Sequence, residues 1–252
     1  MKLYLHQFLS GTGEFSGKKA VFSAVREGEV SVGGRVVLDS KYHFNPEKKA
    51  VSWKGRKLNL PEERIYLLLN KPVGYISSRL SERDMKLGKR SVFELIRGDV
   101  PAKARNSLFC VGRLDEGTCG LLVLSNDGKL GSWLAKPQSR IGKTYSVVLD
   151  KPLTESQISE IEKGVEIVLE ENGKTRKYKT KPCSIVRKSD KTFEITISEG
   201  KKREVRRIFE SIGSKVARLC RISIGGLRLD DLKIREGSYV AVSKEFLAGK
   251  IG

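Results

Sequence analysis

Residues 120–125, with the sequence GLLVLS, form an apolar run that has no polar face. A short run of this kind between turn residues is typical of a strand that is buried on both sides. Strand-like segments recur at KTYSVVLD, VEIVLE and TFEITISEG, and helical patterns such as SVFELIRG are fewer. The chain is therefore predicted to have an α+β fold around a mixed, mostly antiparallel sheet. Residues 79–90 are charged and aperiodic, and they are predicted to form a mobile loop.

The N-terminal part of the chain has a different pattern. Residues 3–9 and a second segment that Ser16 can cap are predicted to be helices, and Gly28 ends the second one. The buried face of that second helix is predicted to contain Val21, Ala24 and Val25. The sequence EVSVGGRVV then predicts a tight hairpin around its Gly-Gly turn. A polar, proline-bounded stretch follows, so domains are predicted at 1–62 and 63–252.

The charge of the chain points to a polyanionic partner. Its 252 residues include 49 Lys and Arg against 30 Asp and Glu, a net charge of +19. No run of about 18 apolar residues and no N-terminal signal pattern is present, so a membrane partner is not expected and a cytoplasmic location is. The four cysteines are too scattered for a zinc site, and neither a disulfide nor a metal is expected.

A single carboxylate stands out in the segment GRLDEGTCG. Asp115 follows Arg113 and precedes two glycines, and a lone Asp in such a turn is most often a turn residue. Three further stretches accompany it along the chain: NKPVGY at 70–75, KTYSV at 143–147 and EGKKREVRRIFESIG at 199–213. This combination favours a functional role for Asp115.

These four stretches, in this order, resemble the pseudouridine synthases that act on ribosomal RNA and have an N-terminal S4 RNA-binding module. The long signature GRLDxxTxGLLxLxNDG carries most of the resemblance, and LHQFL, SGKKA and GEVSVGG resemble the S4 module. The resemblance implies isomerisation of a uridine in ribosomal RNA to pseudouridine without a cofactor. It also implies an S4-like domain at 1–62 and a catalytic domain at 63–252, and a monomer is expected.

The resemblance assigns roles to individual residues. Asp115 corresponds to the essential catalytic aspartate, Tyr145 to the tyrosine that stacks on the target base, and Arg206 to the cation that keeps the aspartate ionised. Arg113 is expected to contact RNA phosphate or to fill the space of the flipped base. Further basic residues are expected to contact the RNA backbone: Lys18, Lys19, Arg26, Lys201, Lys202, Arg203 and Arg207. Lys71 and Pro72 are expected to be scaffold, and Thr118 and Gly120 to shape the Asp115 turn.

Several alternatives stay open on the sequence alone. A noncatalytic RNA-binding or ribosome-assembly factor could share the fold, although Asp115, Tyr145 and Arg206 together argue against it. The same chemistry could act on transfer RNA. Asp115 could add to the base, attack the anomeric carbon of the sugar, or remove a sugar proton to give a glycal, and all three paths need the same carboxylate.

Overall fold

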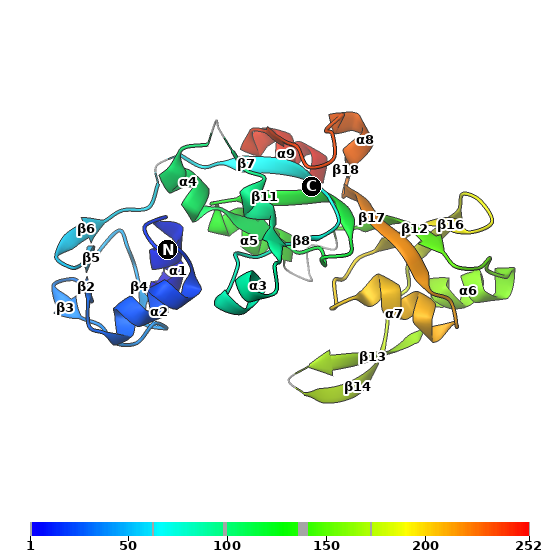
Figure 1. The fold of residues 1–252 in the computed structure, drawn as a ribbon, viewed down its shortest axis with the longest axis horizontal. Helices are drawn as coiled ribbons and strands as arrows, with labels where there is room; N and C mark the ends of the chain where they lie inside the picture. The colour runs from blue at the N-terminus through cyan, green and yellow to red at the C-terminus, as the bar shows by residue number, and fades with distance from the viewer. Residues whose placement is uncertain (1, 62, 98–99, 136–140, 172, 252) are drawn as a thin grey trace.

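The computed structural model describes residues 2–61, 63–97, 100–135, 141–171 and 173–251. A small N-terminal unit lies at one end of the molecule, and a larger body built on a long sheet makes up the rest (Figure 1). The predicted α+β class is confirmed, and most strand pairs are antiparallel, with parallel pairs at β11–β17 and β8–β9.

The N-terminal unit packs around an apolar core of its own. Helix α2 buries Val21, Ala24 and Val25 on one face, as predicted. Gly33 and Gly34 both have positive φ, 59° and 80°, which is the backbone of a type I′ hairpin turn. The elements of this unit are β1 (Leu3–Tyr4), α1 (Leu5–Gly11), α2 (Lys18–Arg26), β2 (Val30–Val32), β3 (Arg35–Val36), β4 (His43–Phe44), β5 (Val51–Trp53) and β6 (Arg56–Leu58).

One predicted detail of this unit was wrong. The N-cap of α2 is Gly17 rather than Ser16, and no side chain provides a cap hydrogen bond. Ser16 lies one position too early for its hydroxyl to accept from the first-turn amides. The predicted boundary at residue 62 falls outside the described residues, so the two-domain division and the S4-like character of the first unit stay predictions.

A central sheet organises the larger body. Its strand order is β15-β16-β12-β17-β11-β7-β19, with β10 beside β11 and β18 beside β17. Strand β11 lies inside it, antiparallel to β7 and parallel to β17. The bounds are β7 (Tyr66–Lys71), β10 (Phe109–Val111), β11 (Cys119–Ser125), β12 (Lys143–Leu149), β15 (Ser184–Arg187), β16 (Thr192–Ile197), β17 (Val216–Ile224), β18 (Leu227–Arg228) and β19 (Tyr239–Ala241).

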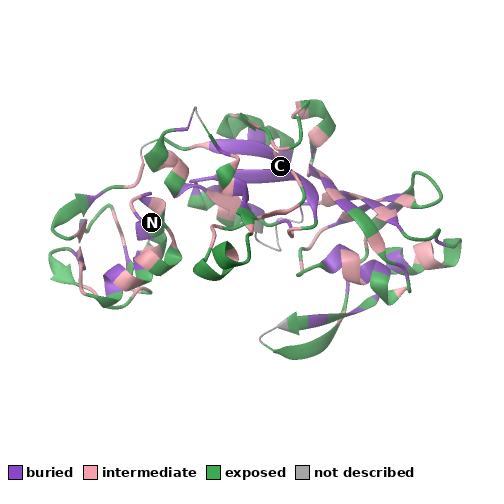
Figure 2. Cartoon of the chain, viewed as in Figure 1, coloured by how far each residue is buried: buried purple, intermediate pink, exposed green. Residues whose placement is uncertain are grey.

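Strand β11 is buried on both faces, which explains its unbroken apolar sequence. Leu122 and Leu124 belong to the core on one side of the sheet, and Leu121 and Val123 to the core on the other. Figure 2 shows the strands of this region as a continuous buried band. Helices α6 (Glu155–Lys163) and α7 (Glu204–Ser211) contribute to the first core, and α5 (Gly128–Ala135) and α9 (Lys244–Ile251) to the second.

The connections contain more structure than the sequence suggested. Residues 79–90, predicted to be a loop, include helix α3 (Glu82–Lys86), which Ser81 and Asp84 cap reciprocally. The predicted helix SVFELIRG is only a short 3₁₀ turn, η1 (Val92–Glu94), preceded by the end of strand β9. The remaining elements are β8 (Tyr75–Ile76), β9 (Arg90–Ser91), α4 (Ala102–Ser107), α8 (Leu229–Leu232) and the hairpin β13 (Glu166–Glu171) and β14 (Lys174–Lys179).

Candidate active site

The loop of residues 112–118, here called the Asp115 loop, connects β10 to β11 and carries the predicted catalytic carboxylate. It ends where β11 begins to pair with β17. At Gly120, φ is +105°, and a Cβ would lie 2.2 Å from the carbonyl oxygen of Arg221. Because no other residue type fits this approach, Gly120 fixes where the loop meets the sheet, as predicted.

Lys71 holds the backbone of the Asp115 loop through hydrogen bonds to its carbonyl oxygens. It is the last residue of β7, its side chain is 0% exposed, and its ammonium donates to the carbonyl oxygens of Thr118 at 2.7 Å and Asp115 at 3.2 Å. It also donates to the carbonyl of Pro72 at 2.9 Å. Burial lowers the pKa of Lys71 from 10.5 to about 8, and the nearby Asp115 and Glu116 carboxylates oppose that shift. The scaffold role predicted for Lys71 takes the form of a buried cation that binds backbone carbonyls.

Other side chains and one amide hold the rest of the loop backbone. Ser77 donates its hydroxyl to the Leu114 carbonyl at 2.7 Å and accepts from the Leu114 amide at 3.1 Å. The amide of Gly74 donates to the Glu116 carbonyl at 2.8 Å. Every carbonyl from residue 114 to residue 118 therefore accepts a hydrogen bond, that of Gly117 from the guanidinium of Arg206. These hydrogen bonds restrain the loop backbone.

Arg206 has a different contact from the one we expected. Its guanidinium, on α7, donates to the carbonyl oxygens of Gly117 at 2.8 Å and Val216 at 3.0 Å. Burial lowers the pKa of Arg206, and the charge of Asp115 opposes this shift, so the two groups interact through space. The cation thus lies against the Asp115 loop, where its hydrogen bonds hold the loop backbone, and its role toward the Asp115 carboxylate stays a prediction.

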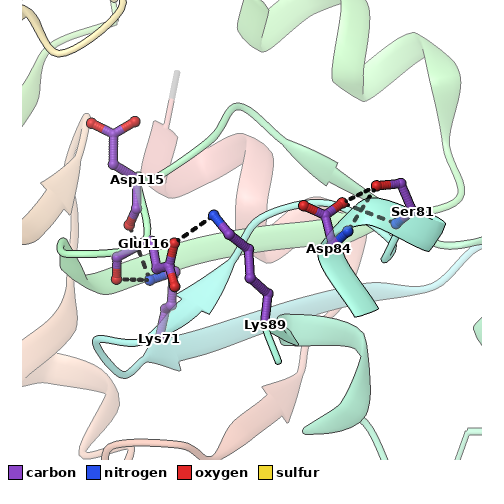
Figure 3. A network of polar contacts seen from close by, with 6 residues as sticks. All are labelled: Lys71, Ser81, Asp84, Lys89, Asp115 and Glu116. Carbon is purple, nitrogen blue, oxygen red and sulfur yellow. Dashed lines mark hydrogen bonds and ion pairs between the residues drawn. The ribbon is translucent and has the colours of Figure 1, made fainter. Parts of the chain in front are cut away.

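The carboxylate of Asp115 points away from the ammonium of Lys71 (Figure 3). Within the described part of the chain, no hydrogen bond or ion pair engages its two oxygens, whereas the neighbouring carboxylate of Glu116 accepts from Lys89 at 2.9 Å. Asp115 is half-buried. An unengaged carboxylate on a fixed backbone can act as a nucleophile or as a base without first breaking a bond within the protein.

Tyr145 lies on β12, which is next to β17 in the sheet. It is 8% exposed and belongs to the core that also contains Leu114 of the Asp115 loop. The base-stacking role assigned to its ring stays a prediction. Arg113, immediately before Leu114, is exposed.

The predicted RNA-contact residues form two separate groups. Lys18, Lys19 and Arg26 are exposed on α2, although Lys19 pairs with Glu82 at 2.6 Å. The second group lies at the start of α7, where Lys202 and Arg203 are exposed and Lys201 and Arg207 are half-buried. The ammonium of Lys201 lies over the ring of Tyr178, 4.9 Å from its centroid.

Sequence reasoning missed two features of this region. Ser77 holds the loop, but a Ser in the sequence YISS has no pattern that announces such a contact. Arg221 and Lys143 line a cavity beside Gly112, and neither was singled out. The signal for Arg221 was its position as a charged residue between Cys220 and Ile222 in a strand-like segment.

Comparisons with known proteins agree with this geometry. A family model described as RNA pseudouridylate synthase matches residues 65–211, more than half of the chain. The ribosomal large subunit pseudouridine synthase B of Bacillus subtilis (strain 168) is 32% identical over 229 residues, 90% of this chain and 88% of that protein. The ribosomal small subunit pseudouridine synthase A of Escherichia coli (strain K12) is 30% identical over 227 residues, 90% of this chain and 91% of that protein.

The fold has a solved counterpart. A structure described as the crystal structure of pseudouridylate synthase superposes with a TM-score of 0.66 at 27% identity, covering 99% of this chain and 100% of that chain. The chain therefore belongs to the RNA pseudouridylate synthase family. It is an RNA pseudouridine synthase, an isomerase. Among the described residues, no helix has the length and apolar character that crossing a bilayer requires.

Proposed function

We propose that this enzyme isomerises a uridine of ribosomal RNA and that Asp115 is its catalytic carboxylate. The observation that supports the role of Asp115 is the contrast within its loop: the backbone is fixed by Lys71, Gly74, Ser77 and Arg206, while the carboxylate of Asp115 itself is unengaged. Rigid positioning of an unengaged reactive group is what catalysis by orientation requires. The names of the two relatives, which refer to the large and the small ribosomal subunit, support ribosomal RNA as substrate.

The reaction needs no external group. The N1–C1′ bond breaks, the uracil turns over, and a C5–C1′ bond forms, while C5 loses a proton and N1 gains one. Asp115 is the carboxylate that assists bond breaking, as nucleophile toward base or sugar or as base toward the sugar. Lys71 and Arg206 both donate hydrogen bonds to the backbone of the loop that carries this carboxylate.

The substrate must leave its stack to reach this carboxylate. Tyr145 belongs to the same core as Leu114 of the loop and is the proposed stacking partner for the flipped uracil, because an aromatic face replaces part of the stacking that the base loses. Arg113 and the basic residues Lys201, Lys202, Arg203 and Arg207 are the proposed contacts to the RNA backbone near the site. The α2 residues Lys18, Lys19 and Arg26 are the proposed contacts of a separate S4-like domain.

A substitution of the carboxylate tests the proposal. Pseudouridine is mapped in ribosomal and transfer RNA from cells that lack the protein and carry either the wild-type chain, Asp115→Asn or Glu116→Gln. Glu116→Gln is the matched control, because it removes the neighbouring carboxylate from the same loop. We expect one ribosomal site to vanish with Asp115→Asn and to persist with Glu116→Gln.

The other outcomes are equally clear. Turnover by Asp115→Asn contradicts the role of this residue. A vanishing site in transfer RNA contradicts the ribosomal substrate while it leaves the chemistry intact. No changed site in either RNA would favour the alternative of a noncatalytic RNA-binding factor.

A further inference from the structure

A narrow cavity lies beside the Asp115 loop, and two basic side chains line it. Its volume is about 30 Å³, and Gly112, the first residue of the loop, forms part of its wall together with Lys143 and Arg221. The rest of the lining is apolar: Val111, Leu134, Ile141 and Ile224. None of these lining residues is acidic.

The guanidinium of Arg221 is buried, and one of its nitrogens lacks a hydrogen-bond acceptor among the described residues. The residue is 2% exposed, and its Nε donates to the carbonyl of Leu121 at 2.8 Å. Its Nη2 is buried and has no hydrogen-bond partner in the described structure. A buried guanidinium nitrogen without an acceptor is unfavourable, so an acceptor from outside the chain would be bound strongly there.

Lys143 adds a second positive charge to the same cavity. Its ammonium has one weak contact, 3.4 Å to the carbonyl of Ile141. Burial lowers the pKa of Lys143, and the neighbouring charge of Arg221 lowers it further, while the charge of Glu204 opposes both effects. Two cations that converge on one apolar cavity repel each other unless an anion lies between them.

From this geometry we infer that Lys143 and Arg221 form a site for phosphate oxygens, occupied by a backbone phosphate of the RNA next to the target uridine. A cavity of about 30 Å³ holds about two water-sized atoms, so it admits two oxygens of a phosphate but not a base. RNA is the favoured source because Gly112, an exposed residue of the lining, lies three residues before Asp115, and because β12 carries both Lys143 and Tyr145. This choice of occupant rests on the proposed function.

The salt dependence of RNA binding tests the site. Dye-labelled hexauridylate is titrated with wild-type protein, Lys143→Gln and Lys143→Arg between 50 and 200 mM KCl. Loss of one phosphate contact to a single strand makes the slope of log K against log salt shallower by about 0.7. We expect that change in Lys143→Gln, no change in Lys143→Arg, and no change in the control Lys163→Gln, whose exposed lysine lies at the end of α6.

A second arm distinguishes the sources of phosphate and needs no substitution. Inorganic phosphate is added to wild-type protein at constant ionic strength, and the Nε–Hε resonance of Arg221 is followed by NMR. A phosphate-dependent shift together with the changed slope supports the inference. A shift with an unchanged slope overturns the RNA source and leaves a site for free phosphate.

The remaining outcomes are separable from the proposed function. No shift and no change of slope would show that the cavity holds water only, which overturns the inference even if the enzyme forms pseudouridine normally. Conversely, absence of pseudouridine formation by the wild-type chain would overturn the proposed function whatever the binding slopes are.

Discussion

Replacement of Lys71 by Met should lower the rate of pseudouridine formation in a chain that remains folded. The wild-type ammonium makes three short hydrogen bonds, to the carbonyl oxygens of Pro72, Asp115 and Thr118, and a longer one of 3.5 Å to the carbonyl oxygen of Glu116. Hydrogen bonds to a charged donor contribute about 1.5–3 kcal/mol each, so their loss removes roughly 5–9 kcal/mol. Part is regained, because burial, which lowers the pKa of Lys71 from 10.5 to about 8, makes the charged ammonium less favourable by about 3 kcal/mol.

The net loss of stabilising free energy is about 2–6 kcal/mol, and it affects the Asp115 loop, whose carbonyls lose their donor. A displacement of about 1 Å there would lower the rate about 100-fold. The matched control is Lys89→Met, which also removes a lysine that contacts this loop. Its pair with Glu116 joins side chains that are 31% and 43% exposed, so it contributes at most about 1 kcal/mol. We expect Lys89→Met to retain activity within roughly fivefold (Figure 3).

Two assays check this reasoning. Single-turnover pseudouridine formation is measured under conditions where urea titration shows each variant to be folded. The free energy of unfolding is then compared between pH 8 and pH 10.5. In that window the unfolded chain keeps the Lys71 proton that the folded chain has released, so wild-type stability rises with pH relative to Lys71→Met. Full activity in Lys71→Met, or a stability difference independent of pH, would refute the anchoring role.

Two further predictions concern stability. Burial raises the pKa of Glu204 to about 8. The folded chain therefore keeps a proton that the unfolded chain loses near pH 4.5. The contribution of Glu204 to the free energy of unfolding falls as the pH rises from 4.5 to 8. Glu204→Gln should therefore gain stability over wild type, by up to roughly 4 kcal/mol at pH 8, and parallel pH curves in urea titrations would contradict this. Gly120→Ala should lower the free energy of unfolding by at least about 3 kcal/mol, because its Cβ meets the Arg221 carbonyl, whereas Gly34→Ala, with positive φ and open space, should lower it by about 1 kcal/mol. Equal midpoints for these two variants in urea would contradict the steric argument.

Local sequence patterns predicted much of the fold. The apolar run of β11 predicted a strand buried on both faces, and the Gly-Gly pair predicted the hairpin of the N-terminal unit. The first depends on a run of apolar side chains and the second on the backbone preference of glycine, and each pattern lies within a few residues. The short helix α3 was missed because a capping box between Ser81 and Asp84 stabilises it, without any buried residue to give it a periodic pattern.

The sequence by itself determined the family and the position of Asp115, because both depend on a long, ordered signature of residue types. Only the tertiary structure decided how that residue is held. Lys71 reaches the Asp115 carbonyl across 44 residues, and Arg206 reaches the Gly117 carbonyl across 89. The acceptors are backbone carbonyls, which every residue possesses, so no pattern of side chains could announce these bonds. The distance between the elements, set by the packing of β7, β11 and α7, selects which carbonyl each cation binds.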